Sequence, residues 1–217
     1  MKKKISLSCV FAVLFLVLIV LVRTVDVAAI GPVGTEVGLS HLNQAFAELT
    51  GVNMGWYELT EVFGDIAIFT ALFFVGVGIC ELLRRRDFKK VDKELYALGL
   101  LYLAVGVLYI LFEFVIVNRR PILMDGETFP EASFPSTHTM IICTVMGSTI
   151  MVLKKFIKND KLRLCLQYVC AILLIVTVIG RLVSGVHWFT DILGGILIST
   201  ALLFLFAAAL EKIEEAS

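Results

Sequence analysis

The chain has 217 residues, of which 59% are hydrophobic, and its mean hydropathy of +0.94 is far above that of a soluble domain of this length. Positive and negative side chains balance to a formal net charge of zero, so the overall charge favours no class of partner. Composition therefore excludes an ordinary soluble enzyme and indicates an integral membrane protein.

Six apolar runs approach the roughly 20 residues that a helix needs to cross the hydrocarbon core of a bilayer. We expect helices at about 5–22, 62–83, 95–117, 138–153, 164–180 and 189–210. The first run follows MKKK and precedes VAA, so a cleaved signal peptide is the alternative to a retained helix, which its length favours. The predicted fold is an all-α bundle of six transmembrane helices that forms a single domain over residues 1–217.

The charges between the runs predict the orientation of the bundle. With alternate crossings, one side holds the N-terminus, the loops at 84–93 and 154–163 and the C-terminus, which together carry 15 of the 19 Lys and Arg residues. Positive loops stay in the cytoplasm, so we expect cytoplasmic termini and a multi-pass protein of the cell membrane. The remaining cations lie on the outer side, and they are Arg23, Arg119, Arg120 and Arg181.

Three polar clusters that are far apart in the sequence meet at this outer face. The first is NRRP at 118–121, where the third helix should end near Arg120, because a residue before proline disfavours the helical region. The planar guanidinium of Arg120 suits a phosphate group. A lone arginine at this depth can also simply extend to lipid headgroups.

The second cluster is FPSTHT at 134–139. Pro135 favours a helix start, and Ser136 or Thr137 is a suitable N-cap. The free backbone N–H groups of a helix N-terminus bind anions, and His138 would lie in the first turn there. An ordinary helix cap beside a surface histidine is the alternative interpretation.

The third cluster is GRLVSGVHWFTD at 180–191, between two apolar runs. His187 and Asp191 are four residues apart, so they share a face if the last helix has begun by then. A carboxylate beside one imidazole nitrogen leaves the other free to act as a base or nucleophile. Arg181 reaches the same place across a short turn. Ionisable groups at membrane depth are functional by default, although a structural His–Asp pair is the alternative.

Together these residues predict a site for phosphoryl chemistry. Two arginines, a hydroxyl and a helix N-terminus would bind the phosphoryl group, one histidine would attack it, and the other would protonate the leaving oxygen. The third histidine, His41, receives no role. A metal site formed by His138, His187 and Asp191 is disfavoured, because the nearby arginines repel a cation and no close histidine pair supports it. We therefore expect no metal and no cofactor.

The three clusters resemble the motifs of the type 2 phosphatidic acid phosphatases, the PAP2 superfamily, which are K-x6-R-P, P-S-G-H and S-R-x5-H-x3-D. The matching segments are Arg120-Pro121, Pro135-Ser136-Thr137-His138 and the spaced trio Arg181, His187 and Asp191. The resemblance implies that His187 is the nucleophile that forms a phosphohistidine, that Asp191 orients it, and that His138 is the general acid. It also implies metal-independent catalysis.

By the same resemblance, phosphate oxygens would be held by Arg120, Arg181, Ser136 and the backbone amide of Thr137. Three positions depart from the family pattern: Glu113 replaces the lysine of the first motif, Thr137 replaces the glycine of the second, and Gly180 replaces the serine of the third.

Glu113 lies two helical turns before Arg120, so we expect both on one helical face. Glu113 either turns away from the phosphate, reads a positive group on the substrate, or reduces activity. A protonated, neutral Glu113 is a further alternative at that depth. Arg119 is a substitute for the missing lysine, so Glu113 and Arg119 are the specificity candidates.

The implied function is an integral-membrane phosphatase that acts at the outer leaflet on a lipid phosphomonoester or diphosphate. Phosphatidate, phosphatidylglycerol phosphate and undecaprenyl diphosphate all fit. The expected partners are the substrate lipid and the bilayer, with no nucleic acid, and the oligomeric state stays open. The alternatives are a lipid phosphotransferase, a lipid or anion transporter, and a catalytically weak binding relative.

Overall fold

The computed structural model describes residues 1–216, and within them the regular structure is helical. The helices are α1 (Lys2–Thr24), α2 (Ser40–Thr50), α3 (Met54–Arg85), α4 (Lys93–Phe114), α5 (Thr137–Phe156), α6 (Asp160–Val183) and α7 (Phe189–Glu215), with short 3-10 turns at Pro32–Gly34 and Phe88–Lys90. All of these except α2 and the two short turns are long and apolar enough to cross a membrane. The six predicted helices are therefore confirmed.

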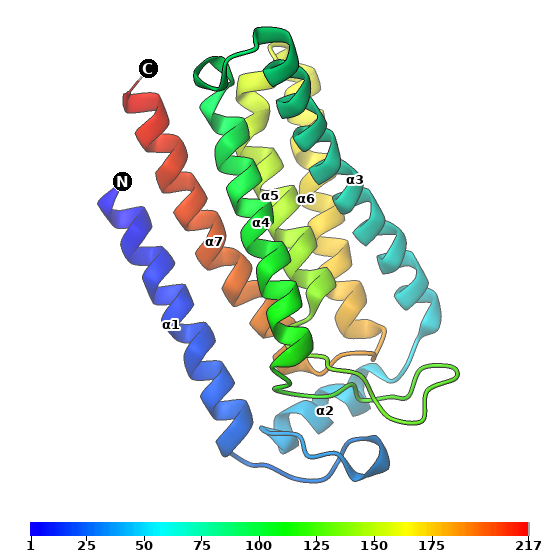
Figure 1. The fold of residues 1–217 in the computed structure, drawn as a ribbon. Coiled ribbons are helices and arrows are strands. Elements are labelled where there is room, and N and C mark those ends of the chain that lie inside the picture. Colours follow the sequence, from blue (N-terminus) through cyan, green and yellow to red (C-terminus); the bar gives the residue numbers. More distant parts are fainter. Residues whose placement is uncertain (217) are drawn as a thin grey trace.

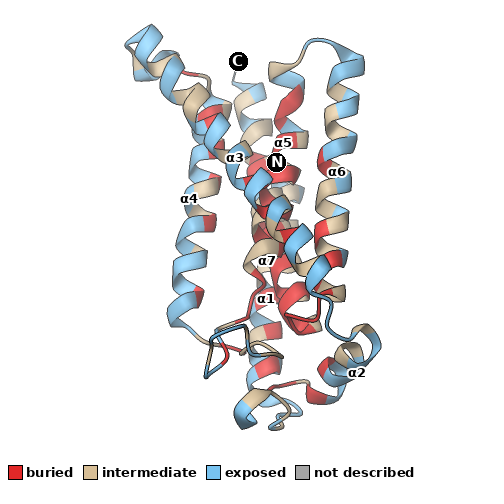
Figure 2. Cartoon of the chain, turned by 90° about the vertical axis from the view of Figure 1, so that its right-hand side faces the viewer, coloured by how far each residue is buried: buried red, intermediate tan, exposed pale blue. Residues whose placement is uncertain are grey.

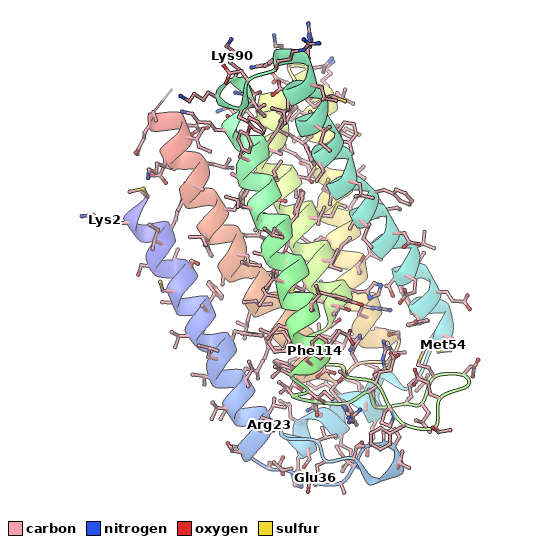
Figure 3. The ribbon with its side chains drawn as sticks, viewed as in Figure 1. Lys2, Arg23, Glu36, Met54, Lys90 and Phe114 are labelled. Carbon is pink, nitrogen blue, oxygen red and sulfur yellow. The ribbon has the colours of Figure 1, made fainter. Side chains whose placement is uncertain are left out.

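The six long helices run side by side, and both chain termini lie at one end of the bundle (Figure 1). Lys2 and Lys90 lie at that end, whereas Arg23, Glu36, Met54 and Phe114 lie toward the other (Figure 3). The short helix α2 lies across the second end, beneath the long helices in this view (Figure 1). The alternate crossings that the sequence predicts are thus present in the fold.

Helices α5 and α7 form the centre of the bundle, and buried residues gather along them (Figure 2). Met140, Ile142 and Met146 of α5 have almost no exposed surface. α5 contacts α3, α4, α6 and α7, whereas α1 packs mainly along α7. The second polar motif lies at the start of α5, and the third motif ends in the first turn of α7.

The surrounding helices turn large apolar side chains outward. Leu16 of α1, Phe69 of α3, Leu100 of α4 and Ile172 of α6 are all exposed. A continuous apolar surface of this extent does not occur on an ordinary soluble protein, and lipid chains would cover it. The chain is a multi-pass membrane protein.

The second predicted helix begins earlier than the sequence indicated, which corrects its boundary from 62 to Met54. The side chain of Asn53 caps the helix and accepts a hydrogen bond from the backbone N of Trp56 at 3.2 Å. At about 1.5 Å per residue, the 32 residues of α3 extend roughly 48 Å, longer than a bilayer core. The first two turns of α3 consequently reach the end of the bundle where α2 lies.

Helix α4 ends at Phe114, six residues before Arg120, so the predicted helix end near Arg120 is wrong. The segment after it is extended: the backbone N of Arg120 donates to Glu131 O at 3.0 Å, and that of Ser133 donates to Asn118 O at 3.0 Å. Arg120 therefore lies on a loop that pairs with residues 131–133. Because Arg120 lies outside α4, the prediction that Glu113 and Arg120 share a helical face is also wrong.

Candidate active site

The N-terminus of α5 has the predicted cap. Ser136 is the N-cap, and its buried Oγ accepts from the backbone N of Thr139 at 3.4 Å and from Thr139 Oγ1 at 3.0 Å. The backbone N of Ser136 donates to the carbonyl O of Asp191 at 2.9 Å. This bond joins the start of α5 to the first turn of α7, so His138 and the third motif lie at one place.

The third motif spans the turn between α6 and α7. Arg181 lies in the last turn of α6 and has no exposed surface, and Asp191 lies in the first turn of α7. Asp191 Oδ2 accepts from the backbone N of Trp188 at 2.9 Å and lies 3.7 Å from Nδ1 of His187. The carboxylate thus caps the helix and faces the imidazole, at a distance longer than a hydrogen bond.

His187 lies in the turn before α7 and is buried. Burial lowers the pKa of His187 well below its usual range, and the positive charges of Arg181 and Arg120 lower it further. A lowered pKa keeps the imidazole neutral at pH 7, and a neutral imidazole has the free lone pair that a nucleophile needs.

Arg120 approaches the same place from the loop after α4. Its Nη2 lies 3.3 Å from Glu131 Oε2, while its Nε and Nη1 are buried without a hydrogen-bond partner. Within the described residues, Nε of Arg181 and both ring nitrogens of His187 are also buried and unpaired. Buried polar groups are rarely left without partners, so this concentration of nitrogen atoms is suited to an anion with several oxygens.

A cavity of about 930 Å³ opens beside these groups. Its polar part is lined by Arg120, His138 and His187, and its other part follows the facing sides of α3 and α4 past Ile68 and Leu72. Thr137 and Glu113 also line it. Glu61, Asp65 and Glu131 line it as well, so the cavity joins a polar end with basic and acidic side chains to an apolar cleft.

Arg119 points elsewhere. Its Nη1 donates to Pro130 O at 2.7 Å, and its guanidinium lies 4.6 Å from the ring centroid of Phe129. Both contacts lie within the 121–134 loop region, and Arg119 does not line the cavity. Glu113, in contrast, does line the cavity from the last turn of α4.

Helix α3 contributes residues that the sequence motifs did not indicate. Glu61 Oε1 lies 2.8 Å from Arg181 Nη2, and Arg181 Nη1 donates to Thr60 Oγ1 at 3.3 Å. The Arg181 guanidinium also lies 5.1 Å from the ring centroid of Tyr57. The available signal is a carboxylate, Glu61, directly before the apolar run that predicts the second helix.

Close packing between α3 and α6 explains why position 180 is a glycine. A Cβ atom at Gly180 would lie 2.6 Å from Thr60 Cγ2 and 3.0 Å from the Trp56 ring. Those distances are too short for a side chain, so Gly180 allows α3 to pack directly on α6. This close packing brings Thr60 and Glu61 to Arg181.

The acidic, histidine and cysteine side chains do not assemble as a set of ligands. Across residues 1–216, three or more of them do not come together in a group that could hold a metal ion. The carboxylate of Glu61 instead faces Arg181 and His138, and that of Asp191 faces a helix N-terminus. Among the residues that line the cavity, Arg120 and His187 have buried side-chain nitrogen atoms without a hydrogen-bond partner.

The fold is that of a helical membrane protein, and buried histidine and arginine side chains gather at one end of it. Residues 113–215 match the model of the PAP2 superfamily, and this segment contains the motif residues from Glu113 to Asp191. Over this segment the chain is a PAP2-superfamily sequence.

The fold is also similar to a crystal structure of a transmembrane PAP2-type phosphatidylglycerolphosphate phosphatase from Bacillus subtilis. The sequences are 21% identical, the similarity covers 98% of each chain, and the TM-score is 0.64. No curated protein sequence matches the chain. The family model covers the second half of the chain, and the structural similarity extends the common fold to α1 and α3.

Proposed function

We propose that this protein is a metal-independent phosphatase of a membrane lipid phosphomonoester or diphosphate, working through a phosphohistidine at His187. The observation that carries the proposal is a group of buried nitrogen atoms without hydrogen-bond partners: those of Arg120 and His187, which line one cavity, and Nε of Arg181, which lies behind Glu61 and His138 of its wall. A phosphoryl group supplies several acceptor oxygens and negative charge, which is what these donors need.

In the proposed reaction, Nε2 of His187 attacks the phosphorus atom while Nδ1 faces Asp191 Oδ2. The bond between phosphorus and the leaving oxygen breaks, and His138 gives that oxygen a proton. Water then attacks the phosphohistidine and gives a proton to His138, which releases inorganic phosphate and restores both imidazoles. Arg120 and Arg181 stabilise the negative charge that spreads over the phosphoryl oxygens.

The shape of the cavity supports a lipid as the substrate. Its apolar part follows the facing sides of α3 and α4, where Ile68 and Leu72 are exposed. An acyl or prenyl chain placed there would stay in an apolar environment while its phosphate reaches Arg120. Since the end that holds the site carries few cations, we propose that it faces the extracytoplasmic side of the cell membrane.

The specific lipid is part of the proposal. The Bacillus subtilis protein with this fold is described as a phosphatidylglycerolphosphate phosphatase, which makes that lipid a natural member of a substrate panel. Glu113 lines the cavity where the family has lysine, so we propose that it reads a donor or positive group of the lipid headgroup.

The test is phosphate release by purified protein in detergent, with EDTA present, from phosphatidate, lysophosphatidate, phosphatidylglycerol phosphate and undecaprenyl diphosphate. We expect release from at least one lipid and a loss of roughly 1,000-fold or more in His187→Ala, because this variant lacks the proposed nucleophile. His41→Ala is the matched control, since His41 is exposed and hydrogen bonded to Asp26, and it should keep full activity.

EDTA-sensitive release would contradict the metal-independent mechanism. Release that persists in His187→Ala would contradict the phosphohistidine. A folded protein that releases no phosphate from any of these lipids would favour the transport or binding alternatives. Transfer of phosphate to an added lipid alcohol, measured in the same assay, would identify a phosphotransferase.

A further inference from the structure

Glu61 of α3 contacts two residues that the reaction assigns to the substrate. Its Oε1 lies 2.8 Å from Nη2 of Arg181, and its Oε2 lies 3.1 Å from Nε2 of His138. Nη2 of Arg181 also contacts Nδ1 of His138. Glu61 lies outside the segment that matches the family model, and none of the three motifs includes it.

The place of Glu61 is fixed by a whole face of α3. Tyr57, Thr60, Glu61 and Gly64 are spaced so that they share one side of the helix. A Cβ atom at Gly64 would lie 2.6 Å from Cδ2 of His138, so the imidazole packs directly against the helix backbone. Arg181 packs against Tyr57 and Thr60 of the same face. The position of the Glu61 carboxylate between Arg181 and His138 is therefore set by the packing of α3.

These contacts conflict with the needs of a bound lipid phosphate. The phosphoryl oxygens need the guanidinium of Arg181, and a carboxylate that stayed there would place two anions side by side. His138 is also occupied. A guanidinium only donates, so Nδ1 accepts from Arg181, and the single proton on Nε2 is directed to Glu61. In this arrangement His138 cannot give a proton to a leaving oxygen.

We propose that Glu61 takes the place of substrate oxygens at Arg181 and His138 in the empty site, and that the lipid phosphate displaces it. The inference rests on the proposed function. Displacement frees Arg181 for the phosphoryl group and His138 for the leaving oxygen. The Glu61 side chain is 37% exposed toward the cavity side of the bundle, which gives it room to move, whereas Arg181 has none. Glu61 is thus a built-in competitor that weakens the binding of phosphate groups, including the inorganic phosphate that must leave.

The test compares Glu61→Gln with Asp65→Asn in the full-length protein in detergent. Asp65 lies one turn further along α3 and lines the same cavity, but it has no ion pair with Arg181 or His138. The measurements are KM for the best lipid and the inhibition constant of orthovanadate, a phosphate analogue. Because a neutral amide competes less well for a guanidinium, we expect both constants to fall about fivefold in Glu61→Gln. Asp65→Asn should change them less than twofold.

Two results would overturn the inference. One is a KM and a vanadate constant in Glu61→Gln that equal or exceed the wild-type values, which would make Glu61 a purely structural partner of Arg181. The other is an equal fall in both variants, which would indicate a general effect of negative charge in the cavity.

A structure of the wild-type protein with vanadate tests the same inference if Glu61→Gln does not fold. The expected result is an oxyanion in contact with Arg181 and a Glu61 carboxylate moved beyond 4 Å from it; an unmoved carboxylate would overturn the inference while the phosphatase function stands. A wild-type protein that neither releases phosphate nor binds vanadate would overturn the proposed function, and this inference with it.

Discussion

The two ends of the bundle use positive charge in opposite ways. At the end with the termini, many lysines and arginines are exposed and form loose pairs, such as Lys155 with Glu94 at 3.2 Å, where Lys155 is 46% exposed. At the other end, Arg181 is fully buried and its partners come from α3 and α5. Exposed charges set the orientation of a chain in the membrane, whereas a few buried ones can perform chemistry.

The largest effect should come from the buried end. We expect Arg181→Lys to lower kcat/KM for the best lipid by roughly 100-fold or more, because an ammonium cannot replace a planar fork that contacts Thr60 while it holds the proposed phosphate. The matched control is Arg163→Lys, since Arg163 lies at the opposite end of α6 and pairs with Asp160 at 2.7 Å. Equal activity in both variants would remove the distinction between the two ends.

A smaller effect should follow from restoring the family residue at position 180. Gly180→Ser places a side chain against Thr60 and Trp56, so we expect a loss of about 1–3 kcal/mol in stability, visible as a lower thermal unfolding midpoint in detergent. Gly76→Ala is the comparison, because a Cβ atom there meets nothing within 4 Å. An unchanged midpoint for Gly180→Ser would show that α3 packs less closely on α6 than described.

The smallest effect should come from the exposed end. Lys155→Gln removes the pairs with Glu94 and Asp92, and exposed pairs of this kind contribute at most about 1 kcal/mol. We expect kcat/KM to stay within twofold of the wild type. A tenfold loss of activity would mean that the two ends are coupled through α5.

Much of this arrangement follows from local sequence. Long apolar runs predict the spans, the proline and serine at 135–136 predict the start of α5, and the spacing of His187 and Asp191 predicts that they meet at the start of α7. Each of these is a short-range property of consecutive residues. The helix start at Ser136, with His138 in the first turn, is confirmed.

The remaining features depend on contacts between distant segments. The end of α4 at Phe114 follows from the pairing of residues 118–120 with 131–133. Pro121 only indicates that the helix does not continue past residue 120, and it does not predict how much earlier the helix ends. Helix α2 is held by Asn43, which bonds Thr190, and by the stack of Phe46 on Phe189. Glu61 was missed because a helix start placed at 62 leaves it in a loop, and hydropathy alone does not place an interfacial first turn.

The cavity along α3 and α4 also determines how substrate concentration must be expressed. A lipid that reaches Arg120 past Ile68 and Leu72 arrives by diffusion in the plane of the bilayer. Its availability is then a mole fraction of the surrounding lipid, in two dimensions, and not an amount per volume of water. Diluting such a protein with more bilayer would slow it even when the bulk amounts of enzyme and substrate stay the same.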